Sequence, residues 1–390
     1  MTFPLDPEHR LLIDTARKFV ETELMPLEAR VEETGELPVE LASSITRKAK
    51  AAGLFASNMP TDLGGAGLTA FESALVEEEF GATTDILIRR ALGCVYEVML
   101  SSTEEQKEIW LKPTIDGDRI FAVAFTEPGA GSDAAGIKTR AVRNGSGWVL
   151  NGSKTYISDA DFADYFVVSA VTDPTAGPKG ISLFLVDKTD PGFTLGRRQH
   201  MMGNRGTGTY ELFFDDLPLP ANRLLGPEGG GLKLTLTMLG RVRLMQIGAR
   251  TVGRMSRMLR AMTDYARDRR QFGKAIGEFQ MVQQMLADTA LDITTTRLMV
   301  RHTALMMDAG QDLRTHLSMV KIASSEALGR VADRAVQVFG GAGYSKDLEM
   351  ERFYRDARVF RIFDGTSEIH RSVIAKNLLR DGCGVLDSLG

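Results

Sequence analysis

Near the C-terminus, the residues from Arg361 to Arg371 read RIFDGTSEIHR, and this stretch joins two runs whose apolar residues recur with helical spacing. It places one carboxylate, Asp364, on a turn beside Gly365 and the hydroxyl of Thr366. An Asp-Gly pair is common in turns, so a purely structural turn is one interpretation. The other is a carboxylate held ready to take a proton. A second informative stretch, TEPGAGSD, lies far upstream at Thr126–Asp133.

The chain has 390 residues, of which 43% are hydrophobic and 25% charged. This length and composition predict a globular protein of two or three domains. The net charge of −4 gives no electrostatic basis for binding nucleic acid or an acidic membrane. Cys94 and Cys383 are too few and too far apart for a disulfide framework or a thiolate metal site. We find no secretory signal and no apolar run of the ~20 residues that span a bilayer, so we expect a cytoplasmic protein.

Apolar spacing divides the chain into three parts. We predict an N-terminal helical domain over 1–118, a middle β domain over 119–227 and a C-terminal helical domain over 228–390. In the middle part, Gly, Pro, Asn and Asp bound short apolar or alternating runs at 120–125, 148–151, 165–170, 181–186 and 210–214. Strands between two helical blocks indicate an α+β fold with an antiparallel sheet or a small barrel. They argue against alternating βαβ units and hence against a Rossmann core.

Several motifs of known chemistry do not occur in the sequence. There is no Gly-x-Gly-x-x-Gly directly after a strand, no His-Glu-x-x-His, no paired Cys-x-x-Cys and no GxxxxGK phosphate loop. The five histidines show no ligand spacing, so we expect no metal site. Gly340–Gly343 is glycine-rich but lies between helical stretches, where a helix–helix turn is the plain interpretation. A helix is expected to begin at Ser102 or Thr103, because Glu104 and Glu105 suit its first turn.

Together, the two opening stretches resemble signatures of the acyl-CoA dehydrogenase family, flavoenzymes that desaturate acyl thioesters. Further segments similar to that family follow in the family's order, at 151–158, 202–212, 268–273, 337–341 and 354–357. The resemblance implies an N-terminal α-helical domain, a middle antiparallel β domain and a C-terminal four-helix bundle. The family usually has Tyr-Glu-Gly-Thr where this chain has Phe363, Asp364, Gly365 and Thr366.

The resemblance also implies non-covalent FAD. The residues implied to contact it in the same subunit are Phe125, Thr126, Gly131, Ser132, Tyr156, Ser158, Thr366 and Glu368. Tyr156 would stack where the family usually has Trp, and Ser158 would offer its hydroxyl to flavin N5 in place of Thr. The residues implied to reach the FAD of a neighbouring subunit are Arg269, Phe272, Gln337 and Gly341. A homo-oligomer, tetramer or dimer, is therefore expected; the plain alternative for Arg269 is a solvated helix charge.

The implied reaction is α,β-desaturation of an acyl-CoA, with Asp364 taking the α-proton, flavin N5 taking the β-hydride, and an electron-transfer flavoprotein accepting the electrons. Some family members carry the base on the helix after the Gly229–Gly231 turn instead. No Asp or Glu occurs from Gly229 through Thr263, which leaves Asp364 as the only carboxylate at either base position. Besides Asp364, the residues implied at the substrate are Ser132, Gly365, Arg243 and Arg89.

The arginines leave alternatives open. Arg243, Arg250 and Arg257 recur every seven residues, and this helical face could meet CoA phosphates, acidic groups of another subunit, or solvent. Arg243 lies where the family commonly has a CoA-contacting arginine, but its distance to Gly253 is one residue longer than usual. Arg89 and Arg90 fall where the family lines its acyl pocket, and one of them could pair with a distal carboxylate. Either could equally face solvent or an interface.

Three other functions remain open from sequence. An oxidase on the same fold, similar to nitroalkane oxidase, would also suit an aspartate base and would consume oxygen without CoA. A flavin-linked desulfinase or monooxygenase relative would need no base. A non-enzymatic, nucleic-acid-associated relative is disfavoured by the negative net charge. Neither the acyl group nor the physiological electron acceptor is specified by the sequence.

Overall fold

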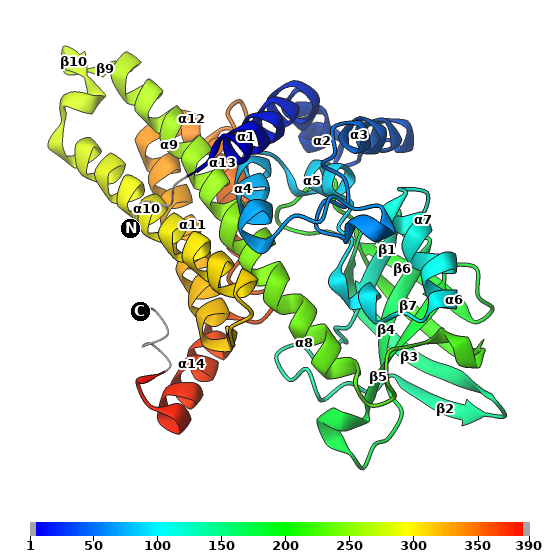
Figure 1. The fold of residues 1–390 in the computed structure, drawn as a ribbon. Coiled ribbons are helices and arrows are strands. Elements are labelled where there is room, and N and C mark those ends of the chain that lie inside the picture. The colour runs from blue at the N-terminus through cyan, green and yellow to red at the C-terminus, as the bar shows by residue number, and fades with distance from the viewer. Residues whose placement is uncertain (1–4, 385–390) are drawn as a thin grey trace.

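The computed structural model describes residues 5–384. Along the chain, helices come first, a twisted sheet follows, and a second set of helices ends the fold (Figure 1). The predicted α+β fold class is therefore confirmed. Within the described part of the chain, no helix is both long enough and apolar enough to cross a membrane.

The first helices are α1 (Pro7–Phe19), α2 (Glu28–Thr34), α3 (Val39–Ala51), α4 (Ala70–Phe80), α5 (Asp85–Leu92), α6 (Glu104–Gln106) and α7 (Lys112–Ile115). Their starts follow ordinary capping chemistry. Thr69 and Glu72 form a reciprocal capping box at α4, and Thr103 forms one with Gln106 at α6. The expected helix start at Thr103 is thus found.

The strands of the main sheet are β1 (Phe121–Ala124), β2 (Arg140–Asn144), β3 (Gly147–Ser158), β4 (Tyr165–Val171), β5 (Ile181–Asp187), β6 (Phe193–Gln199), β7 (Thr209–Leu219) and β8 (Leu224–Leu225). Their order is β6-β7-β3-β2-β4-β5-β8, with β1 beside β4. The sheet is mixed rather than wholly antiparallel as predicted, because β1 and β2 both run parallel to β4. Sequence patterns missed β2 and β6, since most of their side chains are exposed or half-buried and show no apolar alternation.

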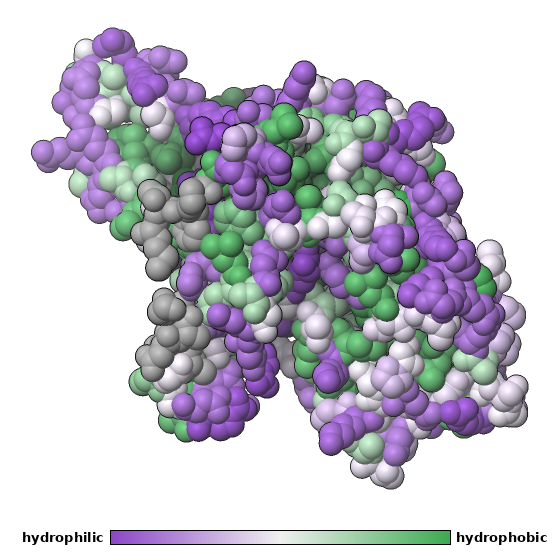
Figure 2. Space-filling model, in the orientation of Figure 1, coloured by the Kyte–Doolittle hydropathy of each residue, from purple (hydrophilic) through white to green (hydrophobic). Residues whose placement is uncertain are grey.

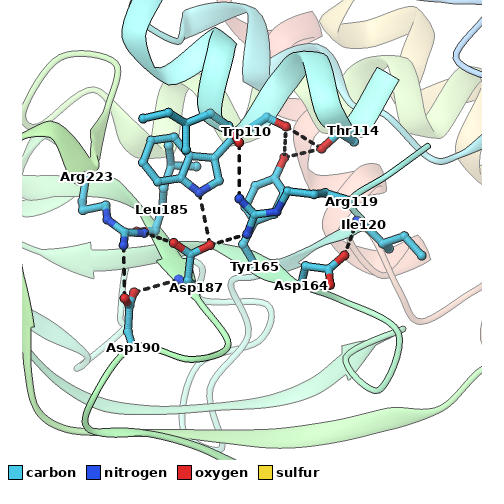
Figure 3. A network of polar contacts seen from close by, with 11 residues as sticks. Trp110, Thr114, Arg119, Ile120, Asp164, Tyr165, Leu185, Asp187, Asp190 and Arg223 are labelled. Atoms are coloured by element: carbon cyan, nitrogen blue, oxygen red, sulfur yellow. Dashed lines mark hydrogen bonds and ion pairs between the residues drawn. The ribbon is translucent and has the colours of Figure 1, made fainter. Parts of the chain in front are cut away.

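A polar network fastens the first helices to the sheet (Figure 3). Trp110, at the end of the N-terminal helices, donates from Nε1 to Asp187 Oδ1 at 3.3 Å. The Asp187 carboxylate at the end of β5 also accepts from Arg119 and, at 2.6 Å, from Arg223. Tyr165, at the start of β4, lies 2.8 Å from the Thr114 hydroxyl. Because these partners come from both parts, the network fixes the orientation of the sheet relative to the helices.

The C-terminal part contains α8 (Gly231–Val242), the π-helical segment η8 (Arg243–Ala249), α9 (Arg250–Asp268), α10 (Gln280–Asp308), α11 (Arg314–Phe339), α12 (Gly341–Tyr344), α13 (Met350–Val359) and α14 (Ser367–Asp381). Its core gathers apolar side chains of η8, α9, α10, α11 and α13 with those of α4. Between α9 and α10, the short strands β9 (Arg270–Gln271) and β10 (Lys274–Ala275) form a projecting hairpin, far from the sheet (Figure 1).

Of the three arginines spaced by seven residues, Arg250 and Arg257 pack against the N-terminal helices of their own chain. Arg250 donates from Nε to Glu77 of α4 at 2.6 Å, and Arg257 donates from Nη1 to Glu28 of α2 at 2.8 Å. Arg250 and Arg257 thus bind carboxylates of their own chain, which departs from the alternatives considered for them from sequence. Helical spacing placed them on one face, but it could not indicate that two distant helices supply carboxylates to that face.

Candidate active site

The turn that carries Asp364 lies between α13 and α14. Asp364 has φ +53° and Gly365 has φ +93°, left-handed values that Asp and Gly accept more readily than most residues. Arg243 Nε donates to the Asp364 backbone carbonyl at 2.9 Å, and His370 Nε2 lies 3.1 Å from the same oxygen. Since a carbonyl can only accept, Nε2 carries the hydrogen. Two donors therefore fix the backbone of the turn, one from η8 and one from α14.

The Asp364 side chain is half-buried, and no hydrogen bond or ion pair holds its carboxylate within residues 5–384. Desolvation raises its pKa, and the nearby charges of Arg243, Lys321 and Arg89 act in the opposite direction. The surroundings are therefore not simply apolar. A carboxylate with a raised pKa and an unoccupied acceptor position has the properties of a general base.

Two further side chains behind this turn are buried. Lys321 of α11 is fully buried, and its Nζ has no hydrogen-bond partner in the described part of the chain. Desolvation lowers the pKa of Lys321 to about 8. Desolvation likewise lowers the pKa of His370 to about 4, so its ring is neutral at neutral pH. The positive charge near Asp364 therefore comes from Arg243, Lys321 and Arg89.

The predicted flavin segment follows β1. Phe125 and Thr126 are half-buried, whereas Gly131 and Ser132 are exposed. Beneath the segment, Lys154 is fully buried and donates from Nζ to the Phe125 carbonyl at 3.0 Å, to Glu127 Oε1 at 2.8 Å and to Ser169 Oγ at 3.0 Å. The segment is thus held from inside, while its outer edge is left open.

Tyr156 projects from an irregular point of β3. The pairing of β3 with β7 shifts register between Lys154 and Ile157, and Tyr156 has φ +58° with 57% of its surface exposed. A left-handed aromatic residue is strained, and such strain is retained most often at binding sites. Thr155 N donates to the Thr126 carbonyl at 2.9 Å, which ties this bulge to the flavin segment. An outward aromatic face beside the hydroxyls of Thr126 and half-buried Ser158 suits a flat, hydrogen-bonding ring, so these residues fit a flavin.

The residues expected to serve a neighbouring subunit do not gather at this segment. Arg269 is exposed, and Phe272, with φ +52°, is 93% exposed at the β9–β10 hairpin. Gln337 and Gly341 are exposed at the junction of α11 and α12. By contrast, Thr366 caps α14 by accepting from Ile369 N at 3.2 Å, and Glu368 is exposed in the first turn of that helix. The space-filling view is indented between the α14 lobe and the β domain (Figure 2).

The pocket arginines are both paired. Arg89 donates from Nε to Asp85 Oδ2 at 2.6 Å, while Arg90 is buried and pairs with Asp159. Neither side chain points freely to solvent. Arg89 lies beside the carboxyl-terminal end of α5, where its charge acts on Tyr96 as well as on Asp364.

Three sequence models, one for each domain of a single protein family, match successive parts of the chain. Residues 6–118 match "Acyl-CoA dehydrogenase, N-terminal domain", 122–217 the middle domain and 229–379 the C-terminal domain. The chain belongs to the acyl-CoA dehydrogenase family. It is 37% identical over 380 residues to the human mitochondrial short-chain specific acyl-CoA dehydrogenase, covering 96% of this chain and 91% of that protein. It is 36% identical over 384 residues to the caffeyl-CoA reductase-Etf complex subunit CarC of Acetobacterium woodii, covering 96% of this chain and 98% of that one.

Solved structures agree with this assignment. Butyryl-CoA dehydrogenase from Megasphaera elsdenii superposes with a TM-score of 0.91 at 31% identity, covering 97% of this chain and 100% of that chain. Homologues named acyl-CoA dehydrogenases are FAD-dependent oxidoreductases, so this family member is an enzyme of that class.

The stretch from Arg243 to Gly253 of this acyl-CoA dehydrogenase family member begins with an irregular helical segment. Helix η8 (Arg243–Ala249) is π-helical, and a π turn closes its hydrogen bonds one residue later than an α turn. From the start of this segment, Arg243 reaches the turn of Asp364. Whether Arg243 also contacts CoA stays a prediction.

Sequence reasoning missed the supporting residues of the site. His370 stands in the opening motif, and its position in the first turn of a helix beginning at Ser367 could have indicated that it faces back toward Asp364. Lys154 likewise lies within a recognised segment. Lys321 carries no such local signal, because α11 brings it under the catalytic turn from a part of the chain distant in sequence.

Proposed function

We propose that this enzyme desaturates a short-chain acyl-CoA between Cα and Cβ, with Asp364 as the base that removes the α-proton. The observation that carries the proposal is the unpaired Asp364 carboxylate on a backbone fixed by Arg243 and His370, with its pKa raised by desolvation. The name of the human relative supports a short acyl chain. Bound FAD would supply the acceptor of the β-hydride.

The chain's own residues account for the proton transfer. When Asp364 takes the α-proton, its buried charge is neutralised, which desolvation favours. Negative charge then develops on the thioester, and the nearby cationic side chains of Arg243, Lys321 and Arg89 stabilise it electrostatically. The two donors to the Asp364 carbonyl hold the carboxylate in place, and a misplacement of about 1 Å costs on the order of a hundredfold in rate.

The test is anaerobic bleaching of the purified yellow protein by butyryl-CoA. Asp364→Asn is expected to keep its FAD and to lose flavin reduction by several orders of magnitude. Asp364→Glu, whose carboxylate extends by roughly one carbon–carbon bond, about 1.5 Å, should fall by about a hundredfold. Exposed Asp347→Asn is the matched control and should reduce at the wild-type rate.

Full reduction in Asp364→Asn would show that the base lies elsewhere or that no α-proton is removed. Rapid oxygen uptake without CoA would instead favour the oxidase alternative, in which the same aspartate takes a proton from a different carbon acid.

FAD is proposed to bind at Phe125, Thr126, Gly131, Ser132, Tyr156 and Ser158, with Thr366 and Glu368 at the start of α14. Arg269, Phe272, Gln337 and Gly341 are proposed to reach the FAD of another subunit. The exposure of Arg269 and Phe272 on a hairpin far from the sheet supports this arrangement (Figure 1). An arginine is suited to this contact because its planar fork binds pyrophosphate oxygens in pairs.

Arg269→Ala should therefore yield a folded protein whose FAD affinity falls by about tenfold to a hundredfold, the loss of one charge-assisted contact of about 1.5–3 kcal/mol. Neighbouring Arg267→Ala, also exposed, is the control. Dilution followed by measurement of bound flavin and of sedimentation gives both readouts. A monomer of Arg269→Ala that retains all its flavin would contradict binding across subunits.

The proposed electron acceptor is an electron-transfer flavoprotein. The name of the Acetobacterium woodii relative, which includes an Etf complex, supports this class of partner. Stopped-flow oxidation of the substrate-reduced enzyme by an electron-transfer flavoprotein tests it, and failure of that oxidation would point to another acceptor.

A further inference from the structure

A small cavity lies between η8 and the segment that follows α5, and Arg89 of α5 acts electrostatically both on Tyr96 in its wall and on Asp364. Met245 and Gln246 line it from η8, only two and three residues beyond the Arg243 that holds Asp364, and Cys94, Val95 and Tyr96 line it after α5. Its volume is about 50 Å³. At ~10–15 Å³ per water-sized group, this space holds about four such groups, which limits any acyl extension to a short one.

The charged groups of the cavity wall are already paired with one another. Arg241 Nε lies 2.8 Å from Glu97 Oε1, and Arg250 lies 2.6 Å from Glu77 and 3.3 Å from Asp85. Nearby Arg89 also bonds to Asp85, at 2.6 Å. A substrate carboxylate here would find no free cation and would lie beside Glu77 and Glu97, so it would be desolvated without compensation.

Two uncharged polar groups of the wall are only partly paired. Gln246 Nε2 approaches the Tyr96 hydroxyl at 3.4 Å, at the long limit of a hydrogen bond. Neither the Tyr96 O–H as donor nor Gln246 Oε1 as acceptor has another partner within the described residues. Burial raises the pKa of Tyr96, which keeps the phenol neutral and its proton available. A donor and an acceptor thus lie side by side in the cavity wall.

We infer that Tyr96 and Gln246 select a short acyl chain whose distal end carries an uncharged group that both donates and accepts hydrogen bonds, such as a hydroxyl or a carboxamide. This inference rests on the proposed desaturation of acyl-CoA and names its substrate class. A plain alkyl end would leave both wall groups unsatisfied, and a carboxylate end would meet two carboxylates with no free arginine. The inference therefore favours an uncharged distal end over the dicarboxylyl substrate considered for Arg89.

Two isosteric thioester pairs test the inference by anaerobic flavin reduction. The first pair is 4-hydroxybutyryl-CoA with valeryl-CoA, and the second is succinamyl-CoA with succinyl-CoA. The wild type should prefer the first member of each pair by about tenfold in kcat/KM, the size of an additional neutral hydrogen-bonding contact. Tyr96→Phe and Gln246→Met should each move the 4-hydroxybutyryl to valeryl ratio toward one. Exposed Gln311→Met should leave that ratio as it is.

The outcomes separate this inference from the proposed function. If no thioester, butyryl-CoA included, bleaches the flavin, the desaturation itself is refuted. If bleaching occurs but valeryl-CoA equals 4-hydroxybutyryl-CoA, or succinyl-CoA exceeds succinamyl-CoA, only the inference is overturned. A preference that persists in both variants would also overturn it. Flavin content and melting temperature confirm that each variant is folded, and the ratio within one variant is independent of the amount of active enzyme.

Discussion

Two lysines of this enzyme, Lys154 and Lys321, are equally buried but differ in their hydrogen-bond partners. Both are fully buried, and desolvation lowers the pKa of each to about 8. Lys154, beneath the flavin segment, donates to three oxygens at 2.8–3.0 Å. Lys321, beneath the turn that carries Asp364, has no partner for its Nζ among residues 5–384.

The difference in partners suggests different roles: Lys154 stabilises the structure, whereas Lys321 influences the proposed reaction. The charge of Lys154 is neutralised in place by Glu127, so its role is to fix the flavin segment. The charge of Lys321 is left unpaired and acts through space on Asp364. An unpaired buried ammonium costs stability, and such a cost is retained where the charge serves function. We therefore regard Lys321 as a positioning and electrostatic residue for the base.

The largest effect is expected from Lys154→Met. Removing the ammonium leaves the carboxylate of Glu127, itself only 7% exposed, buried without its cation. Unfolding free energy should fall by about 3–5 kcal/mol, and FAD should be lost with it. Urea denaturation and flavin content measure both, with exposed Lys179→Met as the control. An unchanged urea midpoint would mean that Glu127 finds other partners and that the ion pair does not hold the segment.

Lys321→Met should not lower the unfolding free energy as Lys154→Met does. It removes a charge that has no partner, so unfolding free energy should stay level or rise by about 1–2 kcal/mol. Flavin reduction by substrate should nevertheless slow, because the cation that stabilises the developing anion is gone. Lys376→Met is the exposed control, and Lys321→Arg tests rescue by charge. If the variant were less stable and fully active, Lys321 would have a structural role, as Lys154 does.

The smallest expected effect is on pH dependence. The charge of Lys321 lowers the Asp364 pKa, so its removal should shift the acid limb of kcat/KM upward by a fraction of a pH unit. In the folded protein, Lys321 binds fewer protons than in the unfolded chain between its pKa of about 8 and the ordinary 10.5. Wild-type stability should therefore rise with pH over that interval, and Lys321→Met should lose part of the rise. Superimposable profiles for both proteins would show that the lysine does not influence the base.

Sequence alone predicted the fold and the family because those depend on ordered segments and on apolar spacing. Asp364 was proposed as the base from its motif, and the raised pKa of its carboxyl group had been expected from burial. The Arg243 bond to the Asp364 carbonyl was not predictable, since it depends on how η8 meets a turn 121 residues away in sequence. The mixed pairing of β1 and β2 with β4 was missed for a similar reason, because strand direction follows from the path of the chain between layers.

The π-helical segment η8 affects the directions in which side chains point along the continuous helix formed by α8, η8 and α9. Arg243, at the start of η8, donates a hydrogen bond to the turn that carries Asp364. Arg250, immediately after η8, forms ion pairs with Glu77 and Asp85. In a continuous α-helix, one residue added or removed rotates everything downstream by about 100°, since a turn takes 3.6 residues. A π-helical turn holds more residues than an α-helical one, so the length of η8 sets the angle between the directions in which Arg243 and Arg250 point. Met245 and Gln246 of the cavity wall lie inside η8, so their placement depends on the same π-helical turns that set the directions of the two arginines.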